Sequence, residues 1–365
     1  MSYANRLLLI TVCLGVPAVM LPIAALPIAA LAQEPPPKAP ANVASPDQKL
    51  PPHIRKLTGF GERAEFSLDG RRVLFLSKTF GDAMEIDIET GVIRNLTAHF
   101  PHYGFTRALY LSNGHILLSG PTEFSPANVG AARTNCWLFV MDPESRARPW
   151  PLGVKAAEGP VPSRKRLHIA WSYRAAQFPD KMPPGSSQIL EGDIVYEGGV
   201  PKLVNQRKIL DSVDLPFKAT LEPQNFRPPQ ERELIFSAYD YQQGEVFGVD
   251  LTTGKLTNYS NGPGVYDEPE GIFPSGEFTT VESDKHNPAG TGFDRADIHK
   301  LKLDGSGAME RLTFFADVPT YRSSNPVISD DGRYMAFQMG RSGVAAGIGY
   351  GIFLYDFTKA PAARP

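Results

Sequence analysis

The sequence predicts an all-β fold, a six-bladed β-propeller built from four-stranded antiparallel blades. Two recurring phrases support it: Ser-x-Asp-Gly-Arg with a following apolar run at residues 67–76 and 329–337, and Asp-x-x-Thr-Gly at residues 87–91 and 250–254. The 33 glycines and 34 prolines supply many turns. A unit of several dozen residues that recurs along a chain is typical of repeat architectures, and four antiparallel strands make one propeller blade.

Each phrase predicts one part of a blade. Asp-Gly between two extended segments predicts a hairpin, because a tight turn needs residues that tolerate positive φ. The apolar run that follows is typical of a strand buried between layers. Third strands are expected at residues 84–87, 136–142, 193–197, 246–250, 298–304 and 352–356, and closing strands at residues 94–97, 148–152, 207–210, 255–257 and 311–313. The third unit is the least regular, because Pro-Pro-Gly-Ser-Ser at residues 183–187 interrupts it.

The two ends of the repeat region predict a closed fold. Lys56-Leu57-Thr58 is a closing phrase with no blade before it, whereas the last unit ends after Tyr355-Asp356 without such a phrase. We therefore expect the N-terminal strand to complete the last blade, which leaves no sheet edge open. The alternative is that Leu57-Thr58 is a chance dipeptide in a linker.

The first residues predict export. Arg6 precedes an apolar stretch at residues 7–31, and Ala30-Leu31-Ala32 fits a signal peptidase site. The stretch is long for a signal peptide, so an uncleaved anchor is the competing interpretation, but prolines recur through it and disfavour a straight spanning helix. We predict a signal peptide at residues 1–32, a Pro-rich tether at 33–53, a propeller at 54–360 and a tail at 361–365.

Composition narrows the environment and the partners. Because residues 1–32 predict export, the mature chain is expected to be a periplasmic or secreted monomer with no stable membrane insertion after signal cleavage. It would retain Cys136 as its only cysteine, so an intramolecular disulfide is not possible. With 37 basic and 39 acidic residues, the chain lacks the basic excess expected of a nucleic-acid-binding protein.

The clearest repeat copies resemble a known family. Ser-Asp-Asp-Gly-Arg-Tyr-Met-Ala-Phe at residues 329–337 and Glu-Arg-Leu-Thr at 310–313 are similar to the TolB-type, WD-like propeller repeat of bacterial envelope proteins. The resemblance implies a six-bladed periplasmic propeller that binds a protein or peptide. It does not imply TolB itself, which carries an additional α/β domain before its propeller, whereas here the tether leads directly into the first strand. The same repeat occurs in oligogalacturonate lyases.

The densest polar cluster lies in the fifth unit. Asp267, Glu268 and Glu270 precede its innermost strand, and residues 282–287, which include Glu282, Asp284 and His286, follow the next strand. If each strand reverses direction, the two segments meet on one face near the channel. Two carboxylates and a histidine there can bind a divalent cation or act as acid and base. The candidate catalytic residues are Glu270, Glu282, Asp284 and His286, and the candidate metal ligands are Asp267, Glu270 and His286, for Ca²⁺ or Mn²⁺.

Two hypotheses follow from these residues. The first is a non-catalytic module that binds an envelope protein or peptide, or an oligosaccharide, through Asp267, Glu268, Gln338 and Arg341 at the channel mouth. The second is a carbohydrate-active enzyme, a polysaccharide lyase or glycoside hydrolase, with a carboxylate or metal site in the channel. The chain lacks a nucleophile elbow, His-Glu-x-x-His and a phosphate-binding loop, which favours the first. Acidic loop residues can also be solvated turn formers, and Arg164-Lys165-Arg166 is expected to be a solvated turn.

Overall fold

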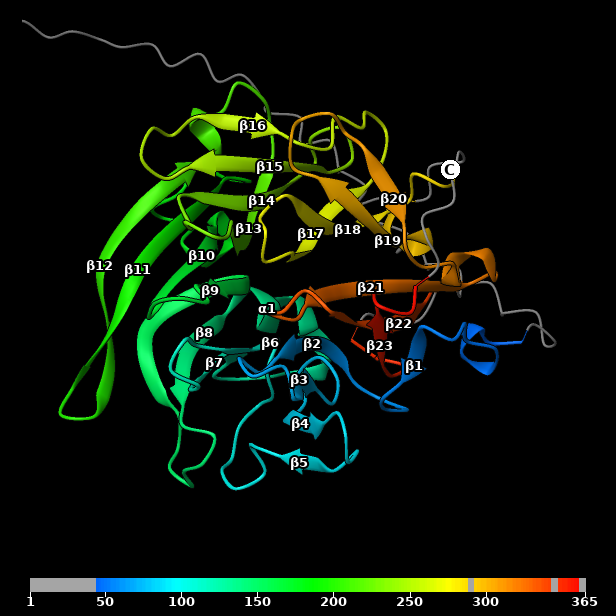
Figure 1. The fold of residues 1–365 in the computed structure, drawn as a ribbon. Coiled ribbons are helices and arrows are strands. Elements are labelled where there is room, and N and C mark those ends of the chain that lie inside the picture. Colours follow the sequence, from blue (N-terminus) through cyan, green and yellow to red (C-terminus); the bar gives the residue numbers. More distant parts are fainter. Residues whose placement is uncertain (1–43, 288–291, 343–346, 361–365) are drawn as a thin grey trace, which may run out of the picture. The chain divides into compact units, whose positions relative to one another are not determined.

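The computed structural model describes residues 44–287, 292–342 and 347–360 (Figure 1). The predicted signal peptide, the first part of the tether and the tail at residues 361–365 lie outside the described residues. The strands of the described part form four four-stranded sheets and one seven-stranded sheet, all antiparallel. The predicted all-β class is therefore confirmed.

The sheets follow one another along the chain. The first contains β2 (Glu62–Phe66), β3 (Arg72–Leu76), β4 (Ala83–Asp87) and β5 (Ile93–Asn95). The seven-stranded sheet contains β6 (Arg107–Tyr110), β7 (Ile116–Pro121), β8 (Cys136–Met141), β9 (Trp150–Pro162), β10 (His168–Arg174), β11 (Ser187–Glu197) and β12 (Val200–Asp211). The next two contain β13 (Thr220–Phe226), β14 (Glu233–Tyr239), β15 (Glu245–Asp250) and β16 (Leu256–Asn258), then β17 (Asp267–Ile272), β18 (Phe278–Ser283), β19 (Asp297–Lys302) and β20 (Met309–Arg311). The last contains β21 (Tyr321–Ile328), β22 (Tyr334–Arg341), β23 (Ile352–Asp356) and β1 (Ile54–Lys56).

Helices are short in the described part of the chain. One α-helix, α1 (Val129–Thr134), precedes β8, and 3₁₀ turns occupy Pro46–Gln48, Pro126–Asn128, Ala175–Gln177, Ser212–Asp214, Gly292–Arg295 and Phe315–Asp317. None of the described helices has the length and apolar character needed to cross a membrane.

Two predicted units share the seven-stranded sheet. The pairs of β9 with β8 run from Trp150 to Ala156, whereas its pairs with β10 run from Ala157 to Pro162. One continuous strand therefore serves as the outer strand of one unit and the inner strand of the next. The closing strand predicted at residues 148–152 is thus present as the first part of β9, but β9 continues without a turn into the next unit.

The repeated phrases are explained by their hydrogen bonds. In the first hairpin, the Ser67 hydroxyl donates to the Asp69 carboxylate at 2.6 Å, and the same carboxylate accepts the Arg71 backbone N–H at 3.1 Å. Ser329 and Asp331 form the same turn, with a 2.6 Å hydrogen bond. In the second phrase, the Asp carboxylate accepts the backbone N–H two residues later, which forms an Asx turn, at 3.1 Å for Asp87 and 3.0 Å for Asp250. The same oxygen also accepts the N–H three residues later, from Thr90 and Thr253, each at 2.7 Å.

The closing phrase fastens an outer strand to the start of the third strand. The Thr97 hydroxyl accepts the Ala83 N–H at 3.2 Å, and Thr313 accepts the Ile298 N–H at 2.8 Å. Thr58 accepts the Ile352 N–H in the same way at 3.0 Å, and β1 pairs with β23. Thr58 therefore does for the last sheet what Thr97 does for the first, which disfavours the interpretation of Leu57-Thr58 as a chance dipeptide.

In the fourth unit the closing strand predicted at residues 255–257 is present as β16, but a serine makes the fastening hydrogen bond. The Ser260 hydroxyl accepts the Val246 N–H at 3.0 Å. Tyr259-Ser260 therefore occupies the place of Leu-Thr, and the predicted Leu256-Thr257 lies earlier, within β16. A serine hydroxyl accepts the same hydrogen bond as a threonine hydroxyl. The fourth unit therefore keeps the closing contact although Tyr-Ser stands where the other units have Leu-Thr.

Neighbouring sheets pack through their faces and meet at their innermost strands. β2 contacts β6, β6 contacts β9, β9 contacts β13, β13 contacts β17, β17 contacts β21, and β21 contacts β2 (Figure 1). A core cluster that includes Phe66, Phe75, Ile352 and Leu354 packs the first sheet against the last. The innermost strands therefore face a common space.

Candidate functional site

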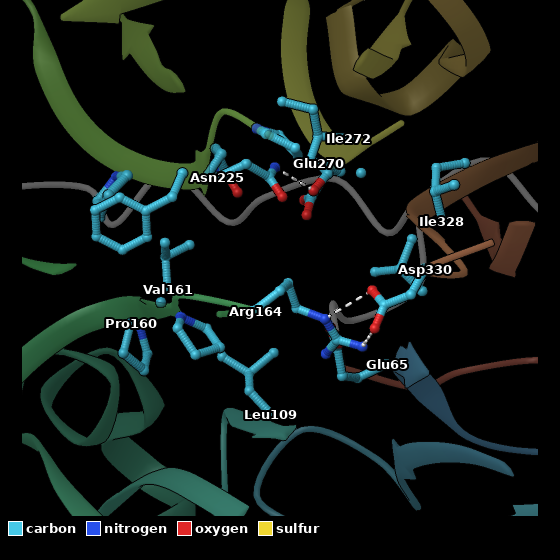
Figure 2. Close-up of a pocket in the computed structure, with 18 of the residues that line it drawn as sticks. Glu65, Leu109, Pro160, Val161, Arg164, Asn225, Glu270, Ile272, Ile328 and Asp330 are labelled. Carbon is cyan, nitrogen blue, oxygen red and sulfur yellow. Dashed lines mark hydrogen bonds and ion pairs between the residues drawn. The ribbon is translucent and has the colours of Figure 1, made fainter. Parts of the chain in front are cut away.

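A pocket lies where the innermost strands converge (Figure 2). Its volume is about 380 Å³, and its walls come from β2, β6, β9, β13, β17 and β21 and from the turns that follow several of them. Each of these strands except β6 has a register shift in its pairing with the next strand of its sheet. Such bulges bend a strand and re-aim side chains, which brings polar groups to the pocket.

An ion pair crosses the pocket. Arg164, in the turn after β9, contacts the Glu65 carboxylate of β2 at 2.8 Å and both Asp330 carboxylate oxygens at 2.9 Å (Figure 2). Burial raises the pKa of Glu65 to about 7, while Arg164 opposes this and Asp330 adds to it. The predicted solvated turn is confirmed for the exposed Lys165 and Arg166 but is wrong for Arg164, whose side chain is 26% exposed and paired within the pocket. A single sequence cannot show that a turn projects inward.

Beside the pocket, three glutamates share one face of the fifth-unit sheet. Glu268 and Glu282 are directly opposite in the antiparallel pairing of β17 with β18, and Glu270 is two residues further along β17. Glu270 lies at the register shift of β17 between Pro269 and Ile272, and this bulge leaves its carboxylate beside the other two. One oxygen of each lies within 4.8 Å of the others. Glu270 also lines the pocket.

Neighbouring groups orient these carboxylates. Glu268 accepts hydrogen bonds from the hydroxyls of Tyr239 and Tyr266. Asn325, in the bulge of β21, donates from its side chain to Glu270 at 2.9 Å and from its backbone N–H to Glu282 at 2.6 Å. Asn325 has φ 48°, a conformation that asparagine tolerates better than most residues. The bulge therefore directs two donors of one residue to two glutamates.

Glu282 is the most deeply placed of the three. Its side chain is fully buried, and its Oε2 accepts no hydrogen bond in the described structure. Burial raises the pKa of Glu282 well above its usual value, and Glu268 and Glu270 raise it further. The Asn325 N–H and Arg322 oppose this rise. Ionisation of the Glu282 carboxyl is therefore energetically unfavourable unless a further group pairs with it.

The other candidate catalytic residues lie in different surroundings. Asp284 accepts the backbone N–H groups of Tyr266 at 2.9 Å and Gly292 at 2.7 Å, which is a loop-stabilising arrangement. His286 lies 3.8 Å from Asp297 and stacks on His299 with ring centroids 5.6 Å apart. Burial, followed by the charge of Arg311, lowers the pKa of His286 to about 4.

Asp267 also lies apart from the three glutamates. It precedes Glu268 on β17, so its side chain belongs to the opposite face, and its Oδ2 lies beside Gly262. Burial raises the pKa of Asp267 to about 7, with Ser283 opposing and Glu245 adding to the shift. The predicted metal set of Asp267, Glu270 and His286 is therefore not brought together as one cluster in the described structure.

The two predicted binding residues of the sixth unit have structural contacts. The Gln338 side chain accepts the backbone N–H of Arg63 at 2.6 Å, just as Glu282 accepts that of Asn325. In both cases, a second-strand side chain is bonded to the bulge of the next sheet. The Arg341 guanidinium lies over the rings of Tyr321 and Tyr350, 5.2 and 5.7 Å from their centroids. Ligand binding by Gln338 and Arg341 stays a prediction.

Sequence reasoning located part of this site. It selected Glu268, Glu270 and Glu282 from the density of polar residues around β17 and β18, but it did not select Glu65, Arg164 or Asp330. Asp330 is the second residue of a Ser-x-Asp-Gly-Arg turn and Glu65 precedes another. The only sequence signal for Glu65 and Asp330 was that these turns connect the innermost strand of a unit to its second strand.

The fold is also found among solved structures. No protein-family model and no curated protein matches the sequence. A putative TolB from Agrobacterium tumefaciens is similar in structure, with a TM-score of 0.50, 14% identity, and coverage of 75% of this chain and 89% of that one. TolB from Acinetobacter baumannii (TM-score 0.46, 16% identity, 82% and 66% covered) and an oligogalacturonate lyase in complex with manganese (0.44, 14%, 81% and 77%) are also found. The chain therefore has the TolB-like β-propeller fold, without being TolB itself.

Proposed function

We propose that this protein is an exported, non-catalytic binding module of the cell envelope whose central pocket holds an extended peptide segment of a protein partner. The fold supporting it is a closed six-bladed propeller, in which β9 belongs to two blades and β1 completes the last. This interpretation is supported by the succession of innermost-strand contacts, which returns from β21 to β2, and by the bond from Ile352 to Thr58.

The chemistry of the pocket wall carries the proposal. Four basic residues line it (Arg63, Arg107, Arg164 and Lys165), together with four acidic ones (Glu65, Glu231, Glu270 and Asp330). Much of the remaining wall consists of six prolines and of aliphatic side chains such as Leu109, Val161 and Ile272. A peptide offers apolar side chains, polar backbone groups and charges of both signs. A polyanionic sugar would be served better by a basic excess.

The pattern of partners favours binding over catalysis. Arg164 is held by Glu65 and Asp330, and Asp284 is held by two backbone N–H groups. His286, the candidate base, lies 3.8 Å from Asp297 and is not a member of the glutamate cluster. An acid and base pair needs both groups within reach of one substrate.

A second candidate function rests on one observation. Glu268, Glu270 and Glu282 converge beside the pocket, and the raised pKa of Glu282 suits a general acid. A carbohydrate-active enzyme, lyase or hydrolase, would use such a group at the channel. This candidate predicts release of unsaturated or reducing ends from an oligosaccharide, and loss of that release in Glu282→Gln.

The binding proposal is tested by site-specific crosslinking in the native envelope. A photo-crosslinking amino acid replaces Lys165, an exposed residue at the pocket rim. A matched control replaces Lys255, which is exposed in the turn between β15 and β16. We expect one envelope protein to be crosslinked from position 165 alone, through a single peptide identified by mass spectrometry. Equal products from both positions, or sugar adducts at position 165, would contradict the proposal.

Export is tested on the same cells. We expect the purified protein to begin at Gln33, and its intact mass measures this directly. A chain that retains residues 1–32 would instead indicate the anchored form.

A further inference from the structure

The three glutamates beside the pocket form an arrangement that protein groups alone do not complete. One oxygen each of Glu268, Glu270 and Glu282 lies within 4.8 Å of the others. Independently, Glu282 is fully buried and its Oε2 accepts no hydrogen bond in the described structure. A buried carboxylate oxygen normally has a partner, so this atom calls for a partner beyond the hydrogen bonds of the described residues.

The donor set identifies the class of that group. All three ligands are carboxylates, and oxygen-only sites suit Ca²⁺, Mg²⁺ and Mn²⁺ over softer metals. Calcium–oxygen distances are about 2.3–2.6 Å, so two ligands on opposite sides of one ion lie about 5 Å apart. The observed separation allows the three oxygens to reach one ion. Water and the open side toward the pocket can supply the remaining ligands.

We propose that Glu268, Glu270 and Glu282 bind one divalent cation, Ca²⁺ or Mn²⁺. This site differs from the metal set expected from the sequence and does not rest on the proposed peptide binding. It adjoins the pocket through Glu270, which belongs to both. A cation there fixes the Glu270 carboxylate and presents a positive centre to any ligand in the pocket.

The surrounding residues are placed as outer partners of such a site. Tyr239 and Tyr266 donate to Glu268, and Asn325 donates to both Glu270 and Glu282. Hydrogen bonds of this kind orient ligating carboxylates before the metal arrives. The competing explanation is a proton shared among the carboxylates, which would stabilise the cluster without any metal.

Terbium luminescence separates the two explanations. Tb³⁺ is a probe for oxygen-ligated cation sites, and the hydroxyls of Tyr239 and Tyr266 are bonded to one proposed ligand, so their rings lie near enough to sensitise a bound ion. Full-length mature protein stripped with EDTA should bind one Tb³⁺ with emission excited through tyrosine. Ca²⁺ or Mn²⁺ should displace it. Whichever of the two displaces at the lower concentration identifies the preferred cation.

Variants assign the site. Glu282→Gln keeps the shape and the acceptor for Asn325 and should weaken binding at least tenfold, as should Glu270→Gln. Glu277→Gln is the matched control, because Glu277 is exposed in the turn between the same two strands. Circular dichroism checks that each variant is folded, and Glu270→Gln keeps the test informative if Glu282→Gln does not fold.

The possible outcomes are distinct. Sensitised emission that both cluster variants lose and the control retains supports the site. No saturable emission, and no change in melting temperature between stripped and Ca²⁺- or Mn²⁺-loaded protein, overturns it in favour of the shared proton. Crosslinking at position 165 that persists in Glu270→Gln would show that peptide binding stands even if the cation site fails.

Discussion

Removal of Arg164 should destabilise the protein in a pH-dependent manner. Arg164→Met keeps most of the side-chain stem but removes the charge that contacts Glu65 at 2.8 Å and Asp330 at 2.9 Å. Breaking a fully buried pair costs about 3–5 kcal/mol. Arg164 is 26% exposed and Asp330 is 39% exposed, so we expect a loss of about 2 kcal/mol at pH 8.

The sign of the pH effect follows from Glu65. Its folded pKa, about 7, lies above the ordinary 4.5, so ionisation of Glu65 reduces stability as pH rises through this range. Arg164 lowers this pKa, so the variant's pKa is higher still and the loss grows above pH 7. At pH 5 Glu65 is protonated in both proteins, and only the exposed pair with Asp330 is lost, which is worth about 1 kcal/mol or less.

Urea unfolding at pH 5 and pH 8 measures the two losses. Arg164→Lys keeps the charge and should lose less than Arg164→Met at pH 8. In a Glu65→Gln background, Arg164→Met should cost clearly less than in the natural protein, since the buried carboxylate is absent. An equal loss at both pH values, or no coupling to Glu65, would refute this account of the pocket.

Three further predictions concern the fold and its titrating groups. Gly276→Ala should cost more than 3 kcal/mol, because a Cβ there would lie 1.9 Å from the Pro228 carbonyl, whereas Gly70→Ala, with the same positive φ and open space, should cost about 1 kcal/mol. Ile54→Ala should cost about 2–4 kcal/mol, because Ile54 fastens β1 into a core cluster, and the exposed Arg55→Ala should cost less than 0.5 kcal/mol. His286→Gln should flatten the acid-induced loss of stability between pH 6.5 and 4, because the natural His286, with its pKa lowered to about 4, stabilises the fold above pH 6.5 and loses this contribution as pH falls.

Each of these predictions has a clear contrary result. Urea unfolding of the two glycine variants should not give equal midpoints, and thermal melting of Ile54→Ala should not match that of Arg55→Ala. For His286→Gln, stability measured in half-unit steps of pH that falls as steeply as in the natural protein would place the acid sensitivity elsewhere.

The cluster around β17 and β18 shows how far local patterns reach into the site. The sequence grouped Glu268, Glu270 and Glu282 because two polar segments flank one predicted hairpin, and an antiparallel turn is a local property. It expected them in the connections before and after the strands, whereas they lie within β17 and β18 themselves. It also grouped Asp284 and His286 with them. Their side chains turn instead to a loop and to Asp297, since the direction of a side chain after a strand depends on which neighbouring element packs there.

The sequence by itself determined the all-β class, the hairpins and the fastening of the outer strands. The hairpins depend on hydrogen bonds between residues a few positions apart, as between Ser67 and Asp69. The outer strands depend on the closing phrase, whose threonine accepts a backbone N–H of the third strand, as Thr58 does from β23. Only the tertiary structure decided three other features. β9 joins two units in one sheet, Arg164 forms an ion pair with Asp330 across the pocket, and Asn325 donates hydrogen bonds to two glutamates. The physical reason is that these contacts join residues far apart in the chain, and their partners are fixed by the packing of whole sheets, which no short stretch of sequence records.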